Sequence, residues 1–279
     1  MSSKRKQDTS KYGKAEALTT FGLPATTASD GPVGAPLAGA GVVGGSGAMF
    51  DAIAERYDFI NRLMTFGIDQ RWRRLAIDAL EAPAGAKILD LATGTGDLAI
   101  LAARRIEGCT VVGIDASVGM LAVGIGKVKA AGLIKRIDLR HGDACQLEVP
   151  DHFVDGVTMG FGIRNVQNRA KALREIARVL KPGARVVILE ATEPSGWLGL
   201  GAKFHMHVVV PRVGALLAKA PQYRYLQQSV AAFPVPKRFA EIMESSGLRV
   251  IEIRRLLFGV AHLWIAVPSG DDSPQPPQA

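Results

Sequence analysis

The apolar positions of this chain form a helical pattern first and a series of short buried runs afterwards. Between residues 50 and 64, apolar side chains recur at alternating spacings of three and four, which makes one face of a helix. These positions are Phe50, Ile53, Tyr57, Ile60 and Met64. A second helix is expected over residues 69–80, and the Ala-Pro-Ala-Gly sequence at 82–85 ends it.

Strand-like and helix-like segments then alternate as far as residue 190. Short apolar runs predict strands at residues 87–92, 110–114, 137–140, 154–159 and 185–190. Helices are expected between them at residues 97–106, 117–131 and 169–180, with Ser117 as an N-cap. This alternation is typical of an α/β fold with a parallel sheet and helices on both faces.

The last part of the pattern differs from the rest. Runs at residues 249–256 and 260–267 flank Phe258-Gly259 and predict a hairpin whose final strand is antiparallel to the others. Almost sixty residues separate this hairpin from the fifth strand, which is more than a crossover needs. We expect this insertion to form a lid over a substrate.

The ends of the chain lack any such pattern. Residues 1–48 are rich in Gly, Ala, Ser, Thr and Pro, and residues 269–279 have a similar composition, so both are expected to be disordered tails around one domain at 49–268. Only two cysteines occur among 279 residues, which excludes a disulfide framework and favours a cytoplasmic location. No apolar run reaches the ~18–20 residues of a membrane span.

A glycine turn at the end of the first strand carries the first candidate chemistry. Gly94, Thr95 and Gly96 follow the apolar run and precede a helix, which is typical of a turn that cradles a nucleotide. Glycine lets the backbone bend sharply and approach a ligand closely. The spacing of Gly94 and Gly96 with Ala99 also fits an NAD site. Asp90 favours a positively charged cofactor such as S-adenosylmethionine, because a carboxylate repels a pyrophosphate.

Two further acids follow the next strands. Asp115 ends the second strand, about twenty residues after the turn, where a carboxylate can bind both ribose hydroxyls of an adenosine ligand. Asp143 follows the third strand, and adenine could rest on the backbone of Ala144. The alternative for each acid is a helix cap or a solvated turn. Together with Gly94, Thr95 and Gly96, these residues are the candidate cofactor-binding set.

Several longer motifs resemble one family of enzymes. Residues 49–67, 161–166 (Phe-Gly-Ile-Arg-Asn-Val), 172–183 and 223–230 are similar to motifs of the ubiquinone/menaquinone biosynthesis C-methyltransferases. The resemblance implies a class I, Rossmann-like methyltransferase fold with a seven-stranded sheet, an antiparallel final strand, N-terminal helices and a lid after strand five. It also implies S-adenosylmethionine as cofactor. Gly160 stands where that family often has a serine.

The resemblance implies carbon methylation of a prenylated quinol, either demethylmenaquinol or the methoxy-polyprenyl-benzoquinol of ubiquinone synthesis. A ring carbon becomes nucleophilic when the neighbouring hydroxyl loses its proton, so the site needs a proton acceptor or a cation. We expect Arg164 to stabilise the quinolate or to orient a water, with Tyr57 as its partner. The alternatives are a salt bridge at a loop for Arg164 and ordinary packing for Tyr57.

The charge of the chain adds expectations about partners. A net charge of +8 permits an anionic partner, and the apolar segment 197–219 with interspersed basic residues is compatible with peripheral contact with the membrane surface, which we expect at the inner face. A homodimer is also compatible with the sequence. One rival function is RNA methylation, but the charged N-terminal segment is too short for an RNA module, so no nucleic-acid partner is expected. The other rival is a non-catalytic S-adenosylmethionine-binding assembly protein. The five histidines predict no metal site.

Overall fold

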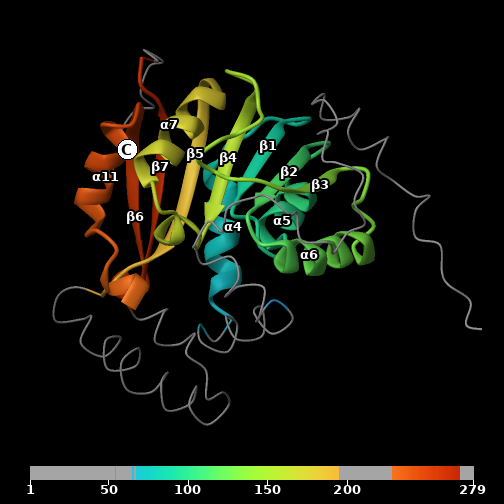
Figure 1. Cartoon of the computed structure of the whole chain (residues 1–279), viewed down its shortest axis with the longest axis horizontal. Helices are drawn as coiled ribbons and strands as arrows, with labels where there is room; N and C mark the ends of the chain where they lie inside the picture. The colour runs from blue at the N-terminus through green and yellow to red at the C-terminus, as the bar shows by residue number, and fades with distance from the viewer. Residues whose placement is uncertain (1–53, 55–64, 66, 195–227, 271–279) are drawn as a thin grey trace, which may run out of the picture.

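Strands and helices alternate in the computed structural model, as the apolar pattern predicts. The structure describes residues 54, 65, 67–194 and 228–270. Its core is a seven-stranded sheet in the order β3-β2-β1-β4-β5-β7-β6 (Figure 1). The strands are β1 (Lys87–Leu91), β2 (Thr110–Asp115), β3 (Ile137–His141), β4 (Val154–Gly160), β5 (Leu180–Ala191), β6 (Leu248–Leu256) and β7 (Ala261–Pro268).

The pairing of the strands confirms the predicted topology. The first five strands are parallel to one another, whereas β7 is antiparallel to both β5 and β6. Because the parallel strands all end at the same edge, the loops after β1, β2, β3 and β4 lie together at the carboxyl edge of the sheet.

Helices cover both faces, and two apolar clusters hold them to the sheet. The helices are α4 (Asp69–Ala79), α5 (Asp97–Arg105), α6 (Val118–Ala130), α7 (Arg169–Val179) and α11 (Pro236–Glu244). Side chains of α4 and α5 pack with Ile88, Val111 and Leu189 on one face. Side chains of α7 and α11 pack with Leu89 and Ile188 on the other, and α11 lies beside β6 in Figure 1.

Most predicted boundaries agree with the structure within one or two residues. The predicted N-cap is confirmed, since the Ser117 side chain accepts a hydrogen bond from the Met120 amide at 3.1 Å. Strand β5 begins earlier than predicted, because Leu180 already pairs with Val154. Within the predicted insertion, the structure describes α11, which the sequence reasoning did not identify.

Several predicted features lie outside the described residues. They include most of the first helix, with Tyr57, the N-terminal tail, most of the C-terminal tail, and the segment at 197–219. Among the helices that the structure does describe, none is long and apolar enough to cross a membrane.

Candidate active site

The glycine turn is held in place by an acid from the neighbouring strand. Gly94 and Gly96 have φ angles of 57° and 79°, in the left-handed region that favours glycine. The Asp115 carboxylate accepts hydrogen bonds from the Gly94 amide at 2.7 Å and from the Ser117 amide at 2.8 Å. One carboxylate therefore joins the turn after β1 to the start of α6. A carboxylate at this position can also accept hydrogen bonds from ligand hydroxyls, since it offers about four acceptor positions.

Thr95, between the two glycines, forms a hydrogen bond through its side chain. Its hydroxyl oxygen accepts a hydrogen bond from Lys127 Nζ at 2.9 Å, and Lys127 also forms an ion pair with Asp97. Thr95 is buried, so the hydroxyl connects the turn to α6.

Asp143 and Ala144 lie beside this turn, after β3. The Asp143 carboxylate accepts a hydrogen bond from the Cys145 amide at 2.8 Å, which closes a local turn, and the side chain is exposed. Gly142 donates its amide to the Asp115 carbonyl at 3.0 Å, which joins the loop to the end of β2. The structure thus places Gly94, Asp115 and Asp143 at the ends of three adjacent strands.

Asp90 lies beneath the turn and is almost completely buried. Its two carboxylate oxygens accept hydrogen bonds from the Thr93 hydroxyl at 2.6 Å and the Thr158 hydroxyl at 2.7 Å. Burial raises the pKa of Asp90 to about 6, while the two threonine hydroxyls and the positive charge of Arg73 act in the opposite direction. The site therefore has a carboxyl group that titrates close to neutral pH.

The loop after β4 carries Arg164 and packs directly against the glycine turn. Phe161 and Ala92 both have positive φ angles, 57° and 47°, although neither is glycine. A Cβ atom on Gly162 would lie 2.4 Å from the Ala92 Cβ, so only glycine fits where the two loops meet. In the loops that follow β1 and β4, the backbone of Gly162 therefore packs against the side chain of Ala92.

Arg164 is buried in a salt bridge, one of the alternatives that the sequence left open. Its Nη1 atom donates to the Glu190 carboxylate and, at 2.7 Å, to the Phe161 carbonyl. Glu190 is fully buried and also accepts from the backbone amides of Arg164 at 3.1 Å and Ala191 at 2.8 Å. Glu190 therefore fixes both the backbone and the guanidinium group of Arg164.

Sequence reasoning missed three polar residues at this edge: Glu190, Arg73 and His262. Arg73, on α4, is buried and lies over the Phe161 ring, 5.4 Å from its centroid. His262 lies opposite Glu190 on β7, and burial lowers its pKa to about 4, helped by Arg255. Its Nδ1 atom lies 2.8 Å from the Thr192 hydroxyl, which itself donates to a backbone carbonyl. No spacing in the sequence brings these residues together, because each comes from a different element.

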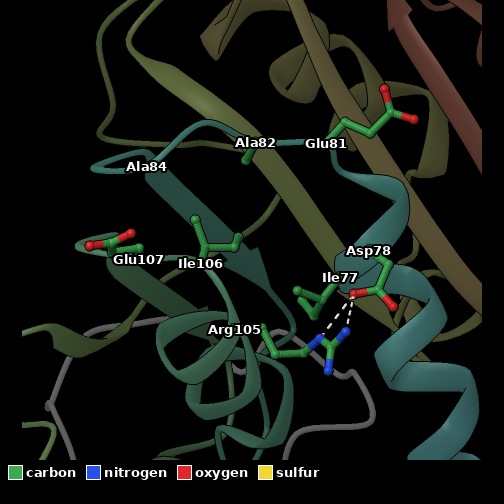
Figure 2. Close-up of a pocket in the computed structure, with 8 residues that line it drawn as sticks. All are labelled: Ile77, Asp78, Glu81, Ala82, Ala84, Arg105, Ile106 and Glu107. Carbon is green, nitrogen blue, oxygen red and sulfur yellow. Dashed lines mark hydrogen bonds and ion pairs between the residues drawn. The ribbon is translucent and has the colours of Figure 1, made fainter.

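A separate hollow of about 280 Å³ lies at the opposite edge of the sheet (Figure 2). It is lined by the end of α4 and by the segments before β1 and β2, and an ion pair between Arg105 and Asp78 at 2.7 Å crosses it. None of the candidate cofactor residues lines this hollow.

The residues at the carboxyl edge fit S-adenosylmethionine. Gly94 and Gly96 let the backbone approach a ligand closely, the Asp115 carboxylate lies at the end of β2 where it can accept from ribose hydroxyls, and the side chain of Ala144 is a single methyl group. The Asp90 carboxyl group, buried behind the turn, suits a cofactor with a positive charge better than a pyrophosphate. Fold and site together define a class I, Rossmann-like methyltransferase that uses S-adenosylmethionine.

Solved structures agree with this class at the level of the fold. The chain is similar to the [4+2]-cyclase SpnF, with a TM-score of 0.60 and 16% identity, covering 80% of this chain and 96% of that one. It is also similar to a SAM dependent methyltransferase from Aquifex aeolicus, with a TM-score of 0.56 and 19% identity over 77% and 97% of the two chains.

The sequence comparisons identify the family. The sequence model of the ubiE/COQ5 methyltransferase family matches residues 45–268, and the chain belongs to this family. It is 44% identical to the demethylmenaquinone methyltransferase of Thermus thermophilus over 219 residues, covering 78% of this chain and 98% of that protein. It is 42% identical to the ubiquinone/menaquinone biosynthesis C-methyltransferase UbiE of Geobacter sulfurreducens over 218 residues, covering 77% and 85%.

Proposed function

We propose that this chain transfers a methyl group from S-adenosylmethionine to a ring carbon of a prenylated quinol. The observation that carries this conclusion is the family match across residues 45–268, which includes every candidate site residue. Relatives that are 40–44% identical bear the names of demethylmenaquinone and ubiquinone/menaquinone biosynthesis methyltransferases. The substrate is accordingly demethylmenaquinol, the methoxy-polyprenyl-benzoquinol, or both.

The cofactor would be held by the loops after β1, β2 and β3. Gly94, Thr95 and Gly96 form the turn under the cofactor, Asp115 binds the ribose hydroxyls, and Asp143 with Ala144 receives the adenine. When bound, the cofactor supplies a methyl group on a positively charged sulfur, ready for in-line displacement. The task of the chain is then to hold the acceptor ring in line and to make its carbon nucleophilic.

Arg164 would supply the cation that favours the quinolate. An arginine stays protonated in proteins, so it acts through its charge and its N–H donors and not as a base. A nearby guanidinium group lowers the pKa of the quinol hydroxyl, so that its proton can pass to water, and the charge of the quinolate spreads to the ortho carbon. After methylation that carbon would release its own proton to water, which restores the aromatic ring. Glu190 supports this proposal because it holds the guanidinium group in one orientation. Tyr57, outside the described residues, is proposed as its partner at the mouth of the site.

Quinone profiling by mass spectrometry after deletion of the gene tests the function. Accumulation of a demethylated quinone, reversed by the parent gene but not by an Asp115→Ala variant, is the expected result. The identity of the accumulating ring separates the menaquinone step from the ubiquinone step. An unchanged quinone pool would contradict the proposal.

Testing Arg164 requires a matched pair of variants. Arg164→Ala alone leaves the Glu190 carboxylate buried without its cation, so a loss of activity could follow from a structural change. We therefore expect the Arg164→Ala/Glu190→Gln double variant to bind S-adenosylhomocysteine normally and to lose turnover. Turnover close to the parent rate in this double variant would rule out a catalytic role for Arg164.

We also propose peripheral contact with the membrane surface, since a polyprenyl quinol dissolves in the bilayer. The basic and apolar segment at 197–219 is the proposed contact, and it lies outside the described residues. Co-sedimentation with anionic liposomes that is lost on charge reversal of Lys203 and Arg212 is expected. Light scattering of the purified chain tests the proposed homodimer.

A further inference from the structure

Arg73 is a buried cation at the edge of the cofactor site, and none of the sequence motifs gives it a role. It lies on α4, and its side chain is 9% exposed. Its one hydrogen bond among the described residues is a long one, 3.4 Å from Nε to the Asp69 carboxylate. The guanidinium group also lies over the Phe161 ring.

The two terminal nitrogens of Arg73 have no hydrogen-bond partner in the part of the chain that the structure describes. A guanidinium group has five N–H donors, and among the described residues the terminal nitrogens of Arg73 are not counted with the fully buried polar atoms that lack a partner, so a ligand can reach them. The long contact to Asp69 engages only Nε, and the ring face of Phe161 does not accept the in-plane N–H bonds. The outer fork of Arg73 is therefore available to bind an anion.

The position of this fork is set by its neighbours on the sheet. A Cβ atom on Gly160, at the end of β4, would lie 3.7 Å from Arg73 Nη1, and the positive charge of Arg73 acts on Asp90 beneath the glycine turn. The fork therefore lies on the carboxyl edge between β1 and β4. This is the side of the glycine turn away from Asp143.

The order of the strands indicates which part of the cofactor reaches Arg73. Asp143 follows β3, Asp115 ends β2 and the glycine turn follows β1, so adenine, ribose and sulfur would succeed one another towards β4. The methionine end of the cofactor then extends to the β1–β4 boundary. This step rests on the proposed roles of Asp115 and Asp143.

We propose that Arg73 binds the α-carboxylate of the methionine moiety of the cofactor. An α-carboxyl group with a pKa of about 3.5 is ionised at neutral pH, and its two oxygens match the planar fork of a guanidinium group. Gly160 has no side chain beside Arg73, and a Cβ atom there would lie 2.6 Å from Leu98, so the position requires glycine. Arg73 thus serves as an anchor for the non-reacting end of the cofactor.

Calorimetric binding of two adenosine ligands to the full chain tests the assignment. S-adenosylhomocysteine has the amino-acid end, whereas 5′-methylthioadenosine lacks it. Arg73→Met should weaken S-adenosylhomocysteine binding by about 10- to 100-fold, as expected for the loss of charge-assisted hydrogen bonds, and leave methylthioadenosine binding unchanged. Arg73→Lys keeps the positive charge but lacks the planar guanidinium group. Its affinity for S-adenosylhomocysteine should therefore lie between that of Arg73→Met and that of the parent.

Matched controls separate a ligand contact from a structural effect. Arg74→Ala removes an exposed cation from the same helix and should change neither affinity. Unchanged methylthioadenosine binding shows that Arg73→Met is folded. Equal weakening of both ligands would overturn the proposal, because it would show that Arg73 supports the turn; parental S-adenosylhomocysteine binding would overturn it as well.

This test is independent of the quinol reaction. A chain that binds S-adenosylhomocysteine through Arg73 but leaves the quinone pool unchanged would fail only the proposed function. A chain that methylates quinol while Arg73→Met binds S-adenosylhomocysteine at the parental affinity would fail only the inference about Arg73. An increased KM for quinol with unchanged cofactor affinity would place the anion of Arg73 on the substrate and would also overturn the inference.

Discussion

Replacing Glu190 by Gln should destabilise the fold strongly, because the carboxylate is fully buried and accepts three hydrogen bonds. Two of them come from Arg164 and one from the Ala191 amide. In Gln one oxygen becomes an NH₂ group, so at least one donor then faces another donor, and the guanidinium group loses its counter-charge. Removing one partner of a buried ion pair costs about 3–5 kcal/mol. Both side chains are at most 6% exposed, so solvent screening reduces this little.

Urea unfolding followed by circular dichroism measures the effect. A loss of about 3–5 kcal/mol corresponds to a decrease in Tm of roughly 6–20 °C for a domain of this size. The double variant Arg164→Met/Glu190→Gln removes both charges and should be more stable than Glu190→Gln alone. Two results would refute the argument that the pair is buried and coupled. One is a Glu190→Gln protein whose free energy of unfolding lies within about 0.5 kcal/mol of the parent value. The other is a double variant whose loss of stability equals the sum of the losses in the two single variants.

Three further predictions concern the same edge of the sheet. Gly162→Ala should cost about 1–3 kcal/mol in urea unfolding, because its Cβ would overlap Ala92, whereas Gly126→Ala, with open space around it, should be neutral or stabilising. The pKa of Asp90 is raised to about 6, so the proton is bound more tightly in the folded state; stability should fall by up to about 3 kcal/mol as the pH rises from about 4 through 6. Asp90→Asn should flatten this part of the pH profile, and an unchanged profile would place the titration elsewhere. Ser117→Ala removes the cap of α6 and should cost about 1 kcal/mol by the same assay.

The sequence predicted the sheet well because each strand is a short apolar run between turn residues. Burial on both faces makes such runs nearly continuous, as in β1 and β7, where almost every residue is buried. Helix α11 was not predicted because its start lies in the sequence Phe-Pro-Val-Pro at 233–236, which is typical of a loop. The structure shows Pro236 in the first turn of α11, where a missing amide proton costs nothing.

The candidate site was only partly predictable, and the reason is physical. Asp115 and Asp143 could be found because Asp115 ends β2 and Asp143 lies just beyond β3, where position along the chain fixes position in space. Arg164 and Glu190 form an ion pair although they are 26 residues apart and belong to the loop after β4 and to β5. Arg73 reaches the site from helix α4. Such side chains come together only when helices and strands pack against one another. Which of them will be in contact cannot be predicted from a single sequence.

The charges at the carboxyl edge also suggest why Arg164 is paired. The cofactor brings a positive sulfonium to this edge, so an uncompensated guanidinium group nearby would repel it in a poorly screened site. In the proposed mechanism Glu190 offsets part of the Arg164 charge, so the guanidinium N–H groups would stabilise a quinolate oxygen while repelling the sulfonium less. An apolar pair of the same volume would be at least as stable, since buried ion pairs contribute little net stability. The proposed role of Arg164, an oriented donor whose charge Glu190 offsets in part, therefore accounts for this buried pair better than stability does.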